Sequence, residues 1–273
     1  MSQAKDTFKH WGGSLLEILA PWIAHDLDQD RHSGRFLRAK RWILYARSVR
    51  ARARGDADAL QKTLSDFWHT DAADAYFDQY GDRFAKWFLG PHHEIVDQLA
   101  VLSRSGDYSR LIEVGCGGGQ VLEHCANAMQ AVQEFIGVDI NPVIIARNQI
   151  HFAQNPRLRF LTADASVWLP KTAKPGTILL TYGGVLEYFS ARTLSAMFES
   201  LAGAAPAAVA LVEPVDPDHD LWRDARSHAF GQENSFSHNH QKLLEATGFK
   251  TVFCKILSLG GQSWVMVLAT TEF

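Results

Sequence analysis

The sequence is poor in cysteine and has no long apolar run, and each shortage argues against a class of protein. The three cysteines, Cys116, Cys125 and Cys254, make no C-x-x-C pair, which argues against a disulfide framework and fits a reducing compartment. No stretch approaches the roughly 18 apolar residues that a membrane span needs. The first ten residues also lack the apolar core of a secretory signal. We therefore expect a cytoplasmic protein with no membrane partner.

A large charge of either sign is also missing. The formal net charge is −3, so no general attraction to nucleic acid or to an anionic membrane is expected. The basic stretch 31–54 is a local exception, in which arginines and lysines are interleaved with Phe36, Trp42 and Tyr45. An amphipathic helix with a solvated or inter-helix basic face is the main interpretation. A homodimer surface and a nucleic-acid surface are the alternatives, and nucleic acid is the least favoured.

The chain divides into two parts with different periodicity. Up to about residue 105, apolar residues recur at helical spacing, as Leu15, Leu19 and Trp22 do. We expect residues 1–105 to form an α-helical N-terminal cap that covers the substrate, and residues 106–273 to form a second domain. There, short apolar runs alternate with helix-like segments. The candidate strands are residues 110–114, 134–139, 158–162, 177–181, 208–213, 250–257 and 263–270.

The second part is predicted to have an α/β fold. Strands that are apolar on both faces and separated by helices imply a parallel sheet covered on both sides. The last two strands are joined by Leu259-Gly260-Gly261, which is short enough for a hairpin, so the last strand should be antiparallel. The prediction is a doubly wound, seven-stranded, mostly parallel sheet with an antiparallel last strand, preceded by the α-helical N-terminal cap.

The most specific pattern is a glycine-rich turn after the first predicted strand. Glu113 is followed by Gly115, Gly117 and Gly119 and then by a helix-like segment. Glycines let the backbone approach a ligand closely, and the helix start offers free N–H groups. The dinucleotide pattern G-x-G-x-x-G would need a glycine at position 120, where the chain has glutamine. A nicotinamide cofactor is therefore disfavoured.

Acidic residues follow the next two strands. Asp139 ends the second strand, where a carboxylate can accept two hydrogen bonds from a ribose diol. Asp164 follows the third strand, and Glu187 lies in the segment after the fourth. Each has an alternative interpretation. Asp139 before Asn-Pro could serve only a turn and helix cap, Asp164 could be a solvated loop carboxylate, and Glu187 could be a surface helix residue.

Together these motifs resemble those of the class I, Rossmann-like S-adenosylmethionine-dependent methyltransferases, of the small-molecule type. The resemblance covers roughly residues 106–273 and implies S-adenosyl-L-methionine as cofactor, with S-adenosyl-L-homocysteine as product. It also implies that Asp164 lies near the adenine amino group and that a tyrosine-bearing N-terminal helix folds over the cofactor. The cofactor-binding candidates are Glu113, Gly115, Cys116, Gly117, Gly119, Asp139, Ile140, Asp164, Ala165, Tyr182 and Tyr76.

The polar segment after the fifth strand is the expected acceptor site, because ligands of such sheets bind beyond the carboxyl ends of the strands. Histidine suits proton transfer near neutral pH, so the catalytic candidates are His238, His240 and Glu187. For the two histidines, a helix-start or packing role and metal ligation are the alternatives, and no metal is expected because a third ligand is missing. Ser237 is the expected N-cap of a helix over 241–247. The substrate-binding candidates are Tyr80, Tyr188, Arg223, Arg226 and His228.

The expected function is methyl transfer, by in-line displacement, to an oxygen or nitrogen atom of a small polar metabolite. The acceptor would bind in a pocket between the cap and the sheet domain. A methyltransferase that acts on RNA or protein, a non-catalytic cofactor-binding protein and an NAD-dependent oxidoreductase are the alternatives. A homodimer is left open.

Overall fold

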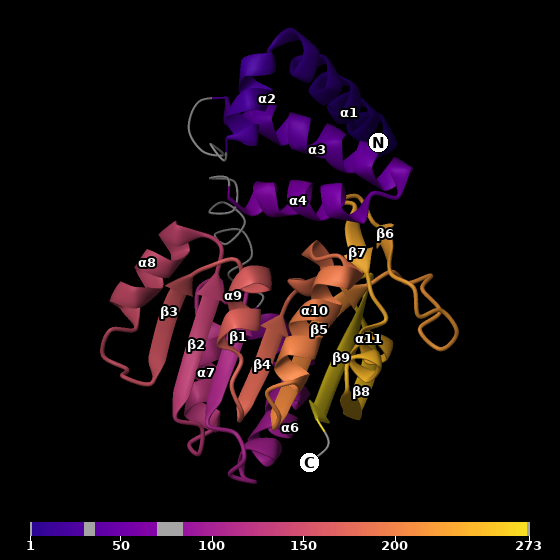
Figure 1. Cartoon of the computed structure of the whole chain (residues 1–273). Coiled ribbons are helices and arrows are strands. Elements are labelled where there is room, and N and C mark those ends of the chain that lie inside the picture. The colour runs from indigo at the N-terminus through magenta and orange to yellow at the C-terminus, as the bar shows by residue number, and fades with distance from the viewer. Residues whose placement is uncertain (1, 30–35, 70–83, 272–273) are drawn as a thin grey trace. The chain divides into compact units, whose positions relative to one another are not determined.

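The computed structural model describes residues 2–29, 36–69 and 84–271, and the chain forms two compact units (Figure 1). The first unit is Met1–Gln79 with His228–Phe236, and the second is Tyr80–Ser227 with Ser237–Phe273. The helix α6 (Glu94–Ser103) packs on strands of the second unit. The domain boundary predicted near residue 105 stays a prediction.

The second unit contains a seven-stranded sheet with the order β3-β2-β1-β4-β5-β9-β8. The first five of these strands are parallel, whereas β9 is antiparallel to both β5 and β8. The predicted fold class, including the antiparallel last strand, is confirmed. The strands are β1 (Arg110–Val114), β2 (Glu134–Asp139), β3 (Leu158–Thr162), β4 (Thr177–Tyr182), β5 (Ala207–Val215), β8 (Phe249–Leu259) and β9 (Gln262–Thr271).

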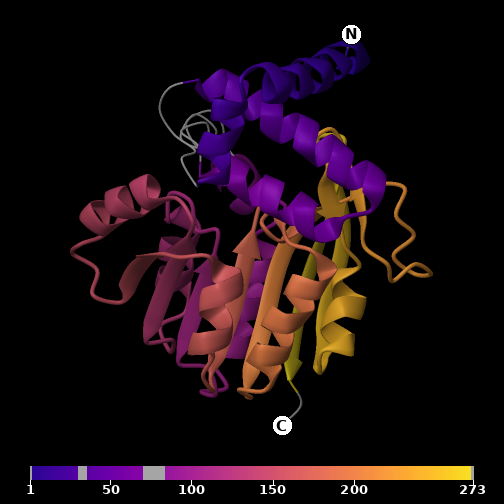
Figure 2. The ribbon, with the colours of Figure 1, turned by 45° about the horizontal axis from the view of Figure 1, so that its top comes forward.

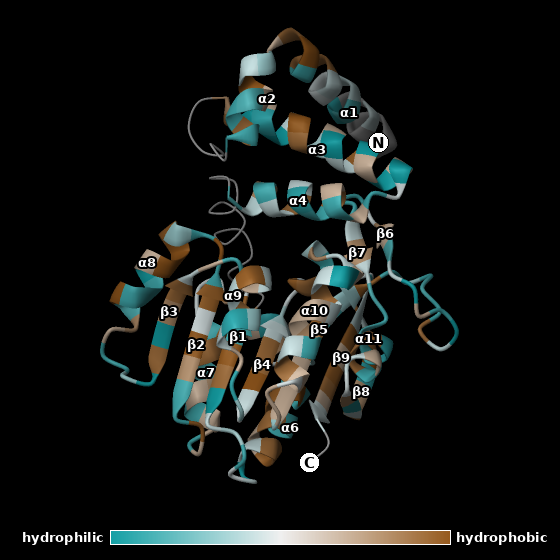
Figure 3. Ribbon diagram, in the orientation of Figure 1, coloured by the Kyte–Doolittle hydropathy of each residue, from teal (hydrophilic) through white to brown (hydrophobic). Residues whose placement is uncertain are grey.

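The burial of the strands agrees with their positions in the sheet. All residues of β1 and β5 are buried, as is expected for central strands covered on both faces, and hydrophobic residues are concentrated in the strands (Figure 3). At the opposite extreme, β8 alternates between buried or half-buried and exposed positions, which fits its place at the sheet edge. The turn between β8 and β9 uses Gly260 and Gly261 at φ values of +61° and +78°, the left-handed conformation that a two-residue hairpin needs.

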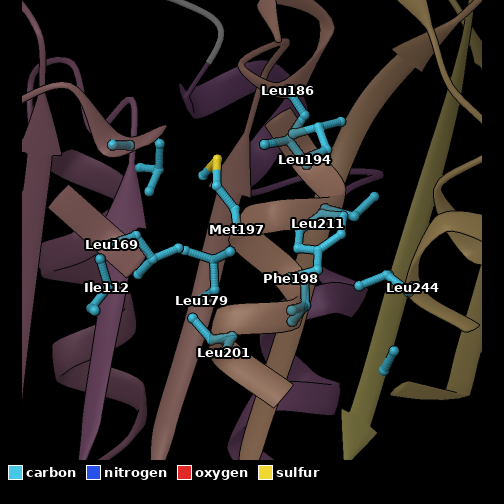
Figure 4. Packing of buried hydrophobic residues seen from close by; sticks show 14 of the residues in the cluster. Ile112, Leu169, Leu179, Leu186, Leu194, Met197, Phe198, Leu201, Leu211 and Leu244 are labelled. Atoms are coloured by element: carbon cyan, nitrogen blue, oxygen red, sulfur yellow. The ribbon is translucent and has the colours of Figure 1, made fainter. Parts of the chain in front are cut away.

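Helices cover both faces of the sheet (Figures 1 and 2). Ile112, Leu179 and Leu211 of the strands pack with Met197 and Phe198 of α10 in one hydrophobic cluster, as Figure 4 shows. Since side chains alternate along a strand, Glu113 and Tyr182 point to the other face. The helices of this unit are the π-helical turn η1 (Phe84–Phe88), α6, α7 (Gln120–Ala128), α8 (Pro142–His151), α9 (Ala165–Thr172), the short 3-10 turn η2 (Leu186–Tyr188), α10 (Ala191–Ala202) and α11 (His240–Ala246).

The first unit is helical as predicted, with one addition. Its helices are α1 (Ser2–Leu19), α2 (Pro21–Asp28), α3 (Leu37–Arg54) and α4 (Ala57–Trp68). The tip of a hairpin formed by β6 (His228–Phe230) and β7 (Ser235–Ser237) belongs to this unit. Arg52 donates hydrogen bonds to the carbonyl of Gly231 (3.1 Å) and the side-chain oxygen of Asn234 (2.9 Å). The segment after β5 thus carries a hairpin that the sequence reasoning did not find.

Three basic side chains of the stretch 31–54, those of Lys40, Arg47 and Arg50, form ion pairs within the first unit. Arg47 pairs with Glu17 (2.7 Å) and Asp28 (2.8 Å), and Arg50 also pairs with Glu17 (2.5 Å). Lys40 is buried, 3.8 Å from Asp26. These contacts favour the inter-helix interpretation over a nucleic-acid surface. Over the described ranges, no helix has both the length and the apolar character to cross a bilayer.

Candidate functional site

The turn between β1 and α7 can be built only with glycine at its start. Gly115 has a φ of +69°, a region that L side chains rarely adopt. A Cβ atom placed there would lie 2.5 Å from Cγ2 of Val185. At Gly119, which precedes α7, a Cβ atom would lie 2.7 Å from the ring of Phe152. The turn therefore requires glycine at both positions, and it leads directly into the free N–H groups at the start of α7.

Asp139 fixes this turn from the end of β2. One carboxylate oxygen accepts the N–H of Gly117 (3.0 Å) and the other accepts the N–H of Asn141 (2.9 Å). The cap of α8 is Asn141, which accepts from the N–H groups of Val143 and Ile144, so Asp139 is not itself the cap. Each carboxylate oxygen has two lone pairs, and the pair can still accept hydroxyl donors such as a ribose diol.

The same turn is also fixed by Asn148, a residue that the sequence reasoning missed. The buried amide of Asn148, in α8, donates to the carbonyl of Gly117 at 2.6 Å. Nothing in the local sequence pattern marks Asn148, because its partner lies 31 residues away. The turn is thus fixed by two side chains, Asp139 at the end of β2 and Asn148 in α8.

Glu113 lies beneath the turn and is 2% exposed. Burial, and then the charge of Asp139, raise the pKa of Glu113 well above its ordinary value. Within the described part of the chain, its Oε2 atom has no hydrogen-bond partner. Cys116 is buried beside it, and burial, with Asp139 and Glu113, likewise raises the pKa of its thiol. A buried acceptor without a donor is suited to a ligand that brings one.

The next predicted cofactor residues lie at the ends of β2 and β3. Ile140 is half-buried between Asp139 and Asn141. Asp164 is exposed and caps α9, where Oδ1 accepts from the N–H (2.9 Å) and the hydroxyl (2.7 Å) of Ser166. Ala165 is buried in the same hydrophobic cluster as Met197 and Phe198. The adenine contact predicted for Asp164 stays a prediction.

The segment after β4 is bound by Glu213, a buried acid of β5. The sequence reasoning treated Glu213 only as the end of a strand. Oε2 of Glu213 accepts the N–H groups of Val185 (2.9 Å) and Leu186 (3.0 Å). Burial raises the pKa of Glu213 to about 7, and the hydrogen bonds from the backbone N–H groups of Val185 and Leu186 keep it from rising further. The sequence did mark Glu213, because it is the one acidic residue in the otherwise apolar strand β5. Glu187, in η2, is half-buried.

A second side-chain cluster lies at the end of β4, on the face covered by α6. Nδ1 of His92 is 3.3 Å from the hydroxyl of Tyr182. The ring of His92 lies 5.2 Å from that of Trp264, and the ring of Phe88 lies 4.8 Å from that of Tyr182. Burial lowers the pKa of His92 to about 4, so its imidazole is neutral at pH 7. In the described chain, His92 Nε2 and Trp264 Nε1 have no hydrogen-bond partner although both are buried.

Strand register places this cluster beside the glycine turn. Val114 pairs with Thr181, and Thr181 pairs with Leu211. Tyr182 therefore lies abreast of the residue after Val114, which is Gly115. Trp264 pairs with Pro214 near the end of β5. The unpartnered nitrogens thus lie along the same sheet edge as the glycine turn, where ligands of such folds bind.

The two histidines predicted as catalytic lie on the other side of the site, in the segment that leads to α11. Nε2 of His238 donates to the carbonyl of Phe189 (3.0 Å), which leaves Nδ1 to accept from the hydroxyl of Ser227 (2.7 Å). His240 is buried with both ring nitrogens unpartnered in the described chain, and burial lowers its pKa well below the ordinary value. This geometry favours the packing interpretation for His238, and the catalytic role of both histidines stays a prediction.

The expected cap of α11 is wrong. Asn239 caps this helix by accepting the N–H of Lys242 (3.2 Å), and α11 begins at His240. Ser237 belongs to β7, and its hydroxyl accepts the N–H of Asp216 (3.0 Å) and bonds Nδ1 of His219 (2.8 Å). The sequence pattern could not choose between two polar residues so close together, because strand β7 was not foreseen.

The predicted substrate-binding residues are dispersed. The side chains of Arg223 and Arg226 are 90% and 89% exposed, and they lie beside Asp220 (3.9 Å) and Asp224 (3.0 Å). Tyr188 is half-buried in η2, and His228 is half-buried at the start of β6, in the first unit. Tyr76 and Tyr80 lie outside the described residues. Within the described ranges, no group of three or more His, Cys, Asp or Glu side chains could hold a metal ion.

Comparison with known families decides the class of this site. Residues 111–207 match the model of a methyltransferase domain family. The chain contains a class I S-adenosylmethionine-dependent methyltransferase domain. The family implies S-adenosylmethionine as the cofactor, and the glycine turn before α7, Asp139 and the unpartnered Glu113 oxygen fit such a group. The sequence has no significant match among curated proteins.

Solved structures share the fold of this methyltransferase. The magnesium protoporphyrin IX methyltransferase of Synechocystis PCC 6803, with bound S-adenosylmethionine, matches with a TM-score of 0.54 and 18% identity, over 78% of this chain and 97% of that chain. The N-methyltransferase NodS of Bradyrhizobium japonicum WM9 matches with a TM-score of 0.50 and 14% identity, over 66% of this chain and 97% of that chain. At these identities the likeness concerns the fold alone.

Proposed function

We propose that the methyltransferase transfers a methyl group to an oxygen or nitrogen atom of a small polar metabolite. The observation that carries this proposal is the pair of buried, unpartnered nitrogens of His92 and Trp264 on the sheet edge that also carries the glycine turn. Leaving such groups unsatisfied costs about 1–3 kcal/mol each. A small polar ligand that enters this cluster would satisfy both nitrogens.

The chain's own residues divide the binding of the cofactor between them. Asp139 would accept the ribose hydroxyls, and the turn from Gly115 to Gly119 would lie against the chain of the cofactor. Glu113 would accept a hydrogen bond from a donor beneath the turn. The sulfonium supplies a methyl group that is already activated for displacement. What the protein adds is proximity and alignment, which can contribute several kcal/mol to lowering the barrier.

The acceptor would be held by Tyr182, His92 and Trp264. These side chains would direct a lone pair of the acceptor toward the methyl group that the cofactor would supply, and the sulfur would keep the electron pair of the carbon–sulfur bond. If the acceptor carries a proton, that proton leaves to a base or to solvent. Because His92 is neutral at pH 7, with a pKa of about 4, we assign it to orienting the acceptor by hydrogen bonding. A carboxylate acceptor has no proton to lose, and a neutral amine can lose its proton to solvent after methylation. Neither acceptor therefore needs a strong base in the site.

The Synechocystis enzyme is named for a small molecule, magnesium protoporphyrin IX, and the NodS protein is named as an N-methyltransferase, which supports a small acceptor with an oxygen or nitrogen atom here. The internal ion pairs of Arg47 and Arg50 remove two of the basic side chains that an RNA substrate would need. The predicted pocket between the two units stays a prediction.

A direct test is an acceptor screen with S-adenosylmethionine labelled in its methyl group. The panel would contain small carboxylic acids, phenols and amines, together with total RNA and a protein mixture. We expect label on a small molecule, with S-adenosylhomocysteine formed in equal amount. Label only on RNA or protein would contradict the proposal. Tight cofactor binding without any turnover would favour a non-catalytic protein instead.

A further inference from the structure

The first unit carries an exposed apolar stripe on α1 and the start of α2. It consists of Trp11, Leu15, Ile18, Leu19 and Trp22, which are 69%, 55%, 74%, 66% and 60% exposed. Residues spaced by three and four share one face of a helix, so the first four lie together along α1. Single exposed apolar residues are ordinary, whereas a contiguous group with two tryptophans marks an interaction surface.

The packing of α1 explains why its large side chains are left outside. The helix packs on α3 through its smallest residues, because a Cβ atom at Gly13 would lie 2.0 Å from the backbone oxygen of Trp42. At Gly12, it would lie 2.9 Å from the Trp42 ring. The close approach of the two helices therefore requires the glycine face of α1. The opposite face of α1, with Trp11, Leu15 and Ile18, is left without a partner among the described residues of this unit.

We propose that this stripe is the contact surface of a homodimer. In an antiparallel pair of α1 helices related by a two-fold axis near Leu15, Trp11 of each copy faces Ile18 and Leu19 of the other. Such a contact is self-complementary, as the interface of a two-fold dimer must be. The exposed area of the five side chains is roughly 600 Å² per copy, so that burying both reaches the lower range of stable interfaces.

The charged side chains next to α1 favour a protein over a membrane as the occupant. Glu17 lies on the α3 side of α1, away from Leu15 and Leu19, and is paired with Arg47 and Arg50. A helix that lies on an anionic membrane has a polar face rich in unpaired lysine and arginine instead. The basic stretch 31–54 is not itself the proposed dimer surface, since its paired arginines serve the packing of α1 and α2 on α3.

Sedimentation of the full chain across a concentration series tests the proposal. We expect a dimer for the wild type and at least a tenfold weaker dimer for the double variant Trp11→Glu, Ile18→Glu. Ile150→Glu is the matched control, because Ile150 is 80% exposed on α8 of the other unit and should leave the dimer unchanged. Circular dichroism and S-adenosylmethionine binding verify that each variant is folded. A wild type that is monomeric throughout, or a dimer unaffected by the double variant, would overturn the proposal.

A cross-linking measurement does not depend on the stability of the double variant. Leu15→Cys, made in a Cys254→Ser background because Cys254 is the exposed natural cysteine, should form a disulfide-linked dimer on mild oxidation. Ile150→Cys in the same background should not. Flotation of the wild type with anionic vesicles is run in parallel. Binding to vesicles without cross-linking would assign the stripe to a membrane surface and overturn the homodimer.

Discussion

The two halves of the candidate site are built on different principles. At β1 and β2 the site is mostly backbone, made of a glycine turn whose N–H and carbonyl groups are fixed by Asp139 and Asn148. At β4 and β9 it is made of side chains, where His92, which precedes α6, contacts Tyr182 and Trp264. A cofactor common to a family can be bound by shared backbone geometry, whereas an acceptor needs side chains of its own.

The largest effect is expected for Gly115→Ala, which should weaken S-adenosylmethionine binding by at least 100-fold, about 2.7 kcal/mol. The added Cβ atom meets Val185 in addition to straining the backbone. Gly55→Ala is the matched control, because Gly55 has nearly the same φ of +66° at the end of α3 and nothing within 4 Å of the added atom. It should cost about 1 kcal/mol of stability and leave binding unchanged. Calorimetry and urea unfolding of both variants measure the difference, and equal binding losses would contradict the account.

The buried Glu213 predicts a pH-dependent stability in the acceptor half. Its pKa is about 7 in the folded chain and near 4.5 when unfolded, so the folded state holds the proton more tightly. Stability from this group is full below pH 4.5 and is lost as the pH rises through 7, by up to about 3 kcal/mol. Glu213→Gln cannot ionise and should gain stability relative to the wild type between pH 5 and pH 8. Urea unfolding at both pH values tests this, and a constant difference would contradict it.

Removing the unpartnered nitrogens of His92 and Trp264 should lower turnover and leave cofactor binding nearly unchanged. His92→Phe and Trp264→Phe keep an aromatic ring and remove the unpartnered polar atom. With the acceptor identified by the screen, kcat/KM should fall by about 30-fold, roughly 2 kcal/mol. The Kd for S-adenosylmethionine should change less than threefold. His240→Phe is the comparison variant, and a larger loss of turnover there would move the acceptor site to the segment before α11.

The smallest expected effect concerns the second support of the glycine turn. Asn148→Ala removes the hydrogen bond to the Gly117 carbonyl and should weaken S-adenosylmethionine binding by about tenfold, 1.4 kcal/mol. Turnover at saturating cofactor should be preserved. Titration calorimetry and steady-state kinetics of the same preparation distinguish the two. A loss of kcat with unchanged cofactor affinity would show that the two halves of the site are not separable.

Sequence reasoning reached the sheet and the backbone half of the site for physical reasons. The bounds of β1, β2 and β3 agree with the predicted strands, because each is a short, mostly apolar stretch between turn residues. Gly115 and Asp139 were found because a turn of this kind needs these residue types at short spacing.

The half of the site that is made of side chains could not be predicted from the sequence in this way. His92 contacts Tyr182 from 90 residues away, and only the fold brings Trp264 beside them. The hairpin of β6 and β7 was missed because its strands have three residues each, too few to show an alternating pattern. Ser237 was therefore given the capping role that belongs to Asn239.

Calorimetric titration with S-adenosylmethionine and S-adenosylhomocysteine tests the central claim most directly. The wild type should bind both at micromolar concentration, and Asp139→Ala should weaken each by tenfold or more, about 1.4 kcal/mol. Asp56→Ala, which removes the cap of α4 in the first unit, should bind like the wild type. A folded wild type that binds neither compound would contradict the account.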